Sequence, residues 1–237
     1  MCDYNLDDIK QLKLEDLPTS YFAMCVARRR GGKTTLVEDI ITRSFTKGLI
    51  NLCYLFSGTD AGFPMIGKDY RFSDISRLDE IVENYKTMNE YNKIADPPNK
   101  FRIKTLVVID DLVLKLKTKE FAKILAELSV NGRHAAYPPL SLNFIIIGQN
   151  LTSFPRILRN NTDLILFNNI SSQKELEYLL DENFYLLDSS RAGKKLGREL
   201  YNKIVTSKPF IFIAIEAYRQ NMRCFADYIK YYCVSKK

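Results

Sequence analysis

The sequence predicts an α/β fold in which a mostly parallel central sheet is flanked by helices. Short, continuously apolar segments recur along the chain, helical patterns alternate with them, and glycine, proline or acidic residues follow several of them. Apolar strands that alternate with helices are typical of a parallel sheet covered on both faces. With 237 residues, 46% of them hydrophobic and 27% charged, the chain is long enough for one large domain of this kind.

Six strands and four main helices are expected. Apolar runs predict strands at residues 21–26, 51–56, 104–109, 143–147, 163–167 and 208–215. Apolar residues at helical spacing predict helices over 36–45, 75–94, 121–131 and 172–180. The third helix is expected to stop near Asn131-Gly132, and Ser171 or Ser172 is expected to cap the fourth. Residues 57–70 are a predicted loop, and 191–198 a surface loop or short helix.

The charge distribution divides the chain into an arm at 1–20, a core at 21–190 and a basic extension at 191–237 that continues the same domain. The net charge is +7, and the extension alone holds eleven Lys and Arg against three Asp and Glu. Eight Phe and Tyr lie among these charges, a mixture that suits contact with a nucleic-acid backbone. The alternative is that the aromatic residues are core and the lysines solvated.

Other features exclude several classes of protein. The five cysteines are odd in number and form no C-x-x-C pair, which favours a reducing compartment over a disulfide framework. A single histidine, His134, argues against a zinc site. No apolar run is long enough to span a membrane, and the polar start does not resemble a secretory signal. We therefore expect neither membrane insertion nor secretion.

The strongest local motif is a glycine-rich loop between a strand and a helix. Such a loop turns backbone N–H groups toward phosphate, and the helix N-terminus adds positive charge. The lysine would reach the β- and γ-phosphates of ATP, and the threonine hydroxyl would ligate Mg²⁺. The residues expected to bind nucleotide are Ala27, Arg28, Arg29, Arg30, Gly31, Gly32, Lys33, Thr34 and Thr35.

This loop departs from the common pattern G-x-x-x-x-G-K-[ST]. Ala27 stands where the pattern has its first glycine. The alternative interpretation is a Gly-Gly turn followed by a solvated lysine. The three consecutive arginines are either a solvated cluster, or one of them lies near the γ-phosphate or a neighbouring subunit.

Polar residues at two strand ends complete a hydrolase pattern. Asp110 and Asp111 follow an apolar strand, where the first carboxylate would hold the Mg²⁺ water shell and the second would polarise the attacking water. Gln149 ends the next strand and would contact the γ-phosphate or that water, unless it is only a turn residue. The chain lacks the D-x-x-G and N-K-x-D patterns of GTPases, and adjacent acids favour hydrolysis over small-molecule phosphorylation.

Three arginines are candidates for completing the site of a neighbouring subunit. Arg133 precedes His134, which we expect to form a loop hydrogen bond, whereas Arg156 and Arg159 follow the strand that ends at Gln149. Ring-forming ATPases use such an arginine to stabilise transition-state charge. For each one the alternative is an ordinary surface arginine.

These motifs, taken in order over about 21–167, resemble the genome-packaging ATPases of poxvirus-type large DNA viruses and virophages, in the FtsK–HerA superfamily. The resemblance implies a RecA-like sheet, a ring of five or six identical subunits, and ATP-driven movement of double-stranded DNA into a capsid. It implies the roles given above for Lys33, Thr34, Asp110, Asp111 and Gln149. The trans-acting arginine would be Arg159 or, second, Arg133. Many superfamily members carry glutamate where this chain has Asp111.

The same resemblance implies a capsid vertex protein as a possible partner, and the host cytoplasm, in a viral factory, or the virion as the location. Two other functions compete with this one. A nucleoside or nucleotide kinase would need a mobile arginine-rich lid, for which 191–198 could be mistaken. A non-catalytic module would bind nucleotide and gate an interaction without turnover.

Overall fold

An eight-stranded sheet forms the centre of the molecule, in the order β3-β2-β4-β5-β1-β6-β7-β8. The computed structural model describes the chain except residues 1–7, 60–61, 96–99, 111, 113–118, 169, 171, 184–190, 208–209, 220–221, 223 and 236–237, and except the side chains of 119–122, 131–134 and 191–193. The strands are β1 (Phe22–Ala27), β2 (Leu52–Ser57), β3 (Arg71–Phe72), β4 (Lys104–Asp110), β5 (Ser141–Gly148), β6 (Leu164–Asn168), β7 (Ile211–Glu216) and β8 (Ile229–Cys233).

In this spatial order the first six strands, β3, β2, β4, β5, β1 and β6, are parallel to one another. Strand β7 pairs antiparallel with β6, and β8 pairs antiparallel with β7. The expected mostly parallel sheet is therefore confirmed. Strand β5 lies between β1 and β4, so the strand that ends at Gly148 separates the glycine-rich loop from Asp110. The carboxyl ends of all the parallel strands meet at one edge, which is where open α/β sheets place their ligands.

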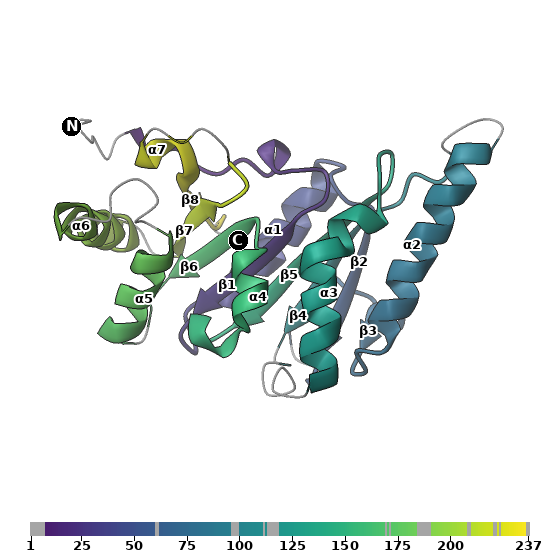
Figure 1. Ribbon diagram of the computed structural model, residues 1–237, viewed down its shortest axis with the longest axis horizontal. Coiled ribbons are helices and arrows are strands. Elements are labelled where there is room, and N and C mark those ends of the chain that lie inside the picture. Colours follow the sequence, from purple (N-terminus) through teal and green to yellow (C-terminus); the bar gives the residue numbers. More distant parts are fainter. Residues whose placement is uncertain are drawn as a thin grey trace.

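Helices cover the sheet unequally on its two faces. In Figure 1, α2, α3 and α4 lie in front of the sheet and α1 lies behind it, while α5 and α6 stand beside the β6–β7 end. The helices are α1 (Lys33–Thr46), α2 (Arg77–Ile94), α3 (Lys119–Ala135), α4 (Arg156–Asn160), α5 (Gln173–Asn183), α6 (Arg191–Ser207) and α7 (Phe225–Tyr228). Among the described residues, no helix is both long and apolar enough to cross a bilayer.

Two hydrophobic cores lie on opposite faces of the sheet, and alternation along β1 divides them. Phe22, Met24 and Val26 enter the core that also contains buried residues of α2, α3, α4, α5 and α6. Ala23 and Cys25 enter the second core, which is built largely on α1. Because successive side chains of a strand point to opposite faces, a strand covered on both sides reads as a continuous apolar run.

Residues 8–17 of the predicted arm pack onto the domain. Leu12 and Leu14 are buried in the α1-side core. The backbone N–H of Leu12 donates to the carbonyl of Tyr231 at 2.8 Å, and the N–H of Tyr231 donates to the carbonyl of Lys10 at 3.1 Å. The arm therefore extends the sheet edge at β8 and covers part of the face that α1 leaves open.

The structure differs from the expected elements in several places. Helix α3 continues through Gly132 to Ala135 rather than stopping near Asn131-Gly132. The stretch 191–198 opens a 17-residue helix, α6, rather than a loop or a short helix. Strands β3 and β8 and the short helices α4 and α7 were not expected. By contrast Ser172 is the cap of α5, since its hydroxyl accepts a hydrogen bond from the N–H of Glu175 at 3.1 Å.

Candidate nucleotide-binding site

The glycine-rich loop connects β1 to α1 at the carboxyl edge of the sheet. Arg30 has φ +62° and Gly32 has φ +81°, so both adopt the left-handed conformation. Ala27 is the last residue of β1, extended and fully buried. The alanine at the first position of the pattern therefore stands in ordinary strand conformation, and glycine is not required there.

Gly31 is held so closely that a side chain would not fit. A Cβ on Gly31 would lie 2.8 Å from the carbonyl oxygen of Arg28 and 3.0 Å from Cβ of Ala27. The N–H of Gly31 donates to that same Arg28 carbonyl at 2.9 Å. The loop is thus a tight turn, a conformation in which successive backbone N–H groups can form an anion-binding concavity.

The side chain of Lys33 lies over this loop. Its ammonium donates hydrogen bonds to the carbonyl oxygens of Ala27, at 2.6 Å, and Arg28, at 3.0 Å. This excludes the interpretation of Lys33 as a freely solvated lysine after a turn. Arg28, Arg29 and Arg30 are all exposed around the loop, which leaves both interpretations of the arginine cluster open.

Lys33 and Asp110 both influence the pKa of one buried thiol, that of Cys25. Burial raises the pKa of Cys25, on β1, to about 12, the Lys33 ammonium opposes this rise and the Asp110 carboxylate adds to it. Lys33 and Asp110 therefore both lie near enough to Cys25 to influence its pKa, although β5 separates β1 from β4. Asp110 ends β4 opposite Ser57 of β2. Asp111 lies outside the described residues.

Gln149 follows β5 directly and is exposed at the same edge. Gly148, which pairs with Val26 of β1, is the last residue of that strand. A Cβ on Gly148 would lie 2.4 Å from Cζ of the buried Phe154, so the ring occupies the space of a side chain there. The packing of Phe154 on Gly148 fixes the point from which Gln149 leaves the sheet.

The loop after β2 borders the first turn of α1, which sequence reasoning did not predict. Gly62, at φ +83°, places its α-carbon so that a Cβ would lie 3.1 Å from Cγ2 of Thr34. A carboxylate oxygen of Glu38 accepts from the N–H of Phe63 at 3.0 Å, and Arg71 donates to the carbonyl of Phe63 at 2.5 Å. The Gly-Phe-Pro sequence marks a turn but does not show that the turn reaches Thr34.

The candidate arginines have different environments. The guanidinium of Arg159, on α4, donates two hydrogen bonds of 3.1 Å to the Glu182 carboxylate and one of 2.6 Å to the Phe154 carbonyl. Its side chain is only 9% exposed. Arg156, one helical turn earlier, is exposed. Arg133 lies in α3, and its side chain is outside the described residues. The assignment of a trans-acting arginine stays a prediction.

In the basic extension most aromatic residues are core. Five of its eight aromatic side chains are buried, namely Tyr201, Phe212, Phe225, Tyr228 and Tyr232. On α6, Lys194 pairs with Asp181 at 2.7 Å and Arg198 with Glu177 at 2.8 Å, both acids on α5. Most aromatic residues of the basic extension are therefore accounted for by packing in the core. Its positive charge is the remaining feature that would attract a nucleic acid.

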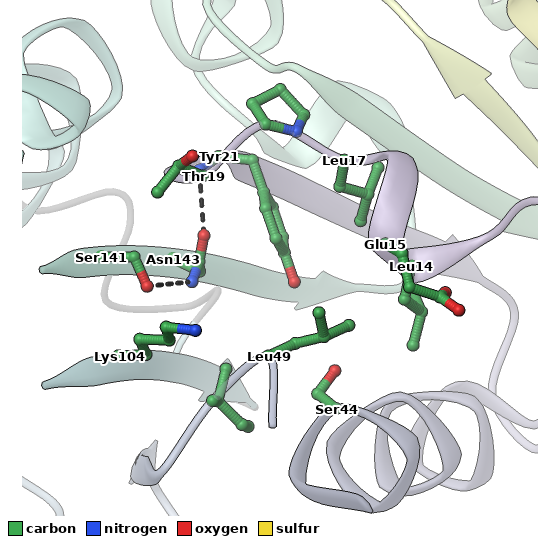
Figure 2. A pocket seen from close by; sticks show the side chains of 12 residues that line it. Leu14, Glu15, Leu17, Thr19, Tyr21, Ser44, Leu49, Lys104, Ser141 and Asn143 are labelled. Atoms are coloured by element: carbon green, nitrogen blue, oxygen red, sulfur yellow. Dashed lines mark hydrogen bonds between the residues drawn. The ribbon is translucent and has the colours of Figure 1, made fainter. Parts of the chain in front are cut away.

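A separate cavity lies at the end of the sheet where the parallel strands begin. It has a volume of about 190 Å³ and lies between the arm, the end of α1 and the amino ends of β1, β4 and β5. Figure 2 shows Tyr21, Lys104 and Asn143 around it, with the Asn143 side chain bonded to the backbone of Tyr21. Since the glycine-rich loop lies at the carboxyl ends of the parallel strands, this cavity is not part of the candidate nucleotide site.

Neither the family models nor the curated proteins give a match to this chain. Among solved structures, the chain is similar to the genome-packaging NTPase B204 from Sulfolobus turreted icosahedral virus 2. Its sulfate complex has a TM-score of 0.59 and 15% identity, over 93% of this chain and 100% of that one. Its ATP-gammaS complex has a TM-score of 0.54 and 17% identity, over 92% and 100%.

Two further structures share this fold. EssC (ATPases 2 and 3) from Geobacillus thermodenitrificans has a TM-score of 0.55 and 13% identity, over 98% of this chain and 41% of that one. The pCW3 conjugation coupling protein TcpA has a TM-score of 0.54 and 13% identity, over 82% and 57%. The chain thus has the fold of this group of ATPases, which confirms the fold expected from its motifs.

Proposed function

We propose that the chain is an ATP-hydrolysing motor that moves double-stranded DNA into a viral capsid. The observation that carries the proposal is the convergence of the closed loop, Lys33, Asp110 and Gln149 at one edge of the sheet. The likeness to the packaging NTPase B204 over its whole length supports it. No other described region combines a tight glycine loop, a helix N-terminus and a strand-end carboxylate.

In this proposal each residue of the site has a distinct chemical task. Phosphate oxygens replace the carbonyls of Ala27 and Arg28 as partners of the Lys33 ammonium. Asp111 orients the attacking water, and Gln149 contacts that water or the γ-phosphate. The Thr34 hydroxyl and the Asp110 carboxylate are hard oxygen ligands that fit Mg²⁺. The bound ion would neutralise charge on the transferring phosphate.

The partners follow from charge and from the same likeness. The 191–237 segment carries the excess positive charge that a duplex backbone attracts. We propose a homo-oligomeric ring of five or six copies acting at a capsid vertex protein, in the host cytoplasm or the virion. Arg156, Arg133 and Arg159 are the arginines to test across the subunit interface. Arg159 would first have to leave Glu182.

The deciding experiment is steady-state ATP hydrolysis with and without duplex DNA over a range of protein concentrations. We expect DNA to raise the rate, the rate to grow more steeply than linearly with concentration, and Lys33→Ala and Asp111→Asn to abolish it. A weak rate that is linear in protein and unaffected by DNA would contradict an assembled pump. ATP binding without any turnover would instead indicate a non-catalytic module.

The structure weakens the kinase alternative. A kinase lid must move over the phosphates, but α6 is a long helix tied to α5 by the pairs of Lys194 and Arg198. A kinase would also need a small phosphate acceptor and would be indifferent to DNA. Adding nucleosides and nucleotides to the same assay tests this directly, since phosphate transfer to any of them would favour the kinase.

A further inference from the structure

A large aromatic ring lies exposed against the phosphate loop. Phe210 precedes β7 directly and is 54% exposed. A Cβ on Gly32 would lie 3.1 Å from Cδ1 of Phe210, so one edge of the ring contacts the loop backbone. Phe212, two residues later, is fully buried beneath the same glycine. Packing in the core therefore accounts for the aromatic side chain of Phe212 but not for the exposed ring of Phe210.

The backbone of Phe210 is held in a conformation that phenylalanine rarely adopts. Its φ is +56°, in the left-handed region that favours glycine, and its carbonyl accepts from the N–H of Val234 at 3.3 Å. Strained conformations of this kind cluster at ligand-binding sites, where the position of the side chain matters. Glycine would adopt this φ without strain, so the presence of a large aromatic side chain at this position calls for an explanation.

The strand order places Phe210 on the nucleoside side of the loop. Asp110 ends β4, two strands from β1 in one direction, and Phe210 opens β7, two strands from β1 in the other. Strand β7 is antiparallel, so its first residues stand at the carboxyl edge of the parallel strands. A nucleotide whose terminal phosphate points toward Asp110 extends its nucleoside in the opposite direction, over β6 and the start of β7.

Resting on the proposed ATP site, we propose that Phe210 is the stacking platform for the nucleotide base. An exposed phenyl face gives a base a planar apolar partner, and such stacking tolerates any base. It would fix the nucleoside end while the loop and Lys33 hold the phosphates. The loss of one aromatic stacking partner corresponds to a roughly 5- to 150-fold loss of affinity.

A buried polar atom on the same path supports this assignment. Asn168 ends β6 beside Ala27, is 5% exposed, and its Oδ1 has no hydrogen-bond partner. Strand alternation places it on the face of Leu166, the α1 side, where Phe212 also packs. Native proteins pair nearly all buried polar atoms, and unpaired ones call for an explanation. Asn168 stands between the loop strand and Phe210, under the path of the nucleoside.

The test separates the base from the phosphates. The sequence contains no tryptophan, so Phe210→Trp creates a single fluorescent reporter. We expect its emission to change on addition of ATP and not on addition of tripolyphosphate. By calorimetry, Phe210→Gly, which keeps the backbone unstrained, should bind ATP roughly 5- to 150-fold more weakly while its affinity for tripolyphosphate stays that of the wild type. Phe210→Ala should behave likewise.

Tyr137→Ala is the matched control, because Tyr137 is 52% exposed but precedes β5 at the opposite edge of the sheet. It should leave ATP affinity unchanged. ATP affinity of Phe210→Gly within twofold of wild type would overturn the assignment, as would equal losses for ATP and tripolyphosphate. A change confined to sedimentation would show instead that Phe210 contacts a second subunit. Failure of the wild-type chain to bind either ligand would refute the ATP site itself.

Discussion

At the scale of single residues, a substitution of Gly31 tests whether the glycine-rich loop binds phosphate. We expect Gly31→Ala to lower ATP affinity at least about tenfold, because its Cβ would press on the Arg28 carbonyl that Lys33 and the loop itself share. Calorimetric titration measures this. Gly48→Ala is the control, since nothing lies within 4 Å of the Cβ position of Gly48, although Gly48, unlike Gly31, has a positive φ. It should cost about 1 kcal/mol of stability without affecting ATP.

The cysteines give a second residue-scale prediction. Burial raises the pKa of Cys25 to about 12 and that of Cys53 to about 12, whereas Cys224 is half-exposed. The thiolate is the reactive form, so a raised pKa slows alkylation at every pH below it. At pH 8.5, maleimide followed by peptide mass mapping should modify Cys224 in the native protein, and Cys25 and Cys53 only after unfolding. Fast native labelling of Cys25 would show that β1 is accessible.

Residue types predicted the loop, the acid pair and Gln149 because each chemistry needs a particular residue at a strand end. The same reasoning did not single out Phe210, for which we propose a role in base stacking, because an aromatic residue in an apolar run is usually interpreted as core. Nor could it distinguish Arg159 from Arg156. Their difference depends on Glu182, which is distant in sequence and adjacent only after folding.

At the scale of elements, the end of β5 depends on the contact between Gly148 and Phe154. Gly148→Ala forces a methyl group into the fully buried ring, so we expect a loss of about 1–3 kcal/mol in the free energy of unfolding. Urea titration measures it. Gly67→Ala, where the nearest atom is 3.5 Å away and φ is −60°, should be close to neutral. The double variant Gly148→Ala/Phe154→Leu should lose less free energy of unfolding than the sum of the losses of the two single variants. A loss equal to that sum would contradict the contact between Gly148 and Phe154.

Strand β8 is tied to α1, the helix that follows the phosphate loop. The Tyr232 hydroxyl donates to Oδ2 of Asp39 at 2.8 Å, and Arg43 pairs with the same carboxylate at 2.9 Å. Burial, followed by Asp39, raises the pKa of Tyr232, so this hydroxyl keeps its proton throughout the neutral range. Tyr232→Phe should cost about 1–2 kcal/mol in urea unfolding. Tyr70→Phe, at an exposed position, should cost much less.

Elements with a local pattern were predictable from the sequence, and those that depend on distant partners were not. Strand β1 is apolar throughout and α1 starts at a glycine-rich turn, so both were placed to within a few residues. Helix α6 begins with Arg, Ala, Gly and two Lys, a composition that reads as a loop until α5 supplies acidic partners. The insertion of β5 between β1 and β4 is non-local, and no segment of sequence encodes it alone.

At the scale of the whole molecule, the two faces of the sheet are covered differently. Six helices, α2 to α7, contribute buried residues to one core, whereas the other is built on α1 with the arm across it. The arm alternates, with Leu12 and Leu14 buried and Gln11 and Lys13 exposed. It therefore behaves as a part of the domain whose removal would expose the core beneath α1 and β8.

This arrangement predicts that the arm contributes substantially to global stability. Leu12→Ala/Leu14→Ala should lose about 4–10 kcal/mol in the free energy of unfolding, because each large-to-small change in a core costs about 2–5 kcal/mol. The neighbouring pair Gln11→Ala/Lys13→Ala should stay within about 1 kcal/mol of wild type. Equal and small effects in the two double variants, measured by urea denaturation, would mean that the arm is a dispensable appendage. A large effect confined to the leucines would mean that α1, and with it the phosphate loop, rests on a core that the arm completes.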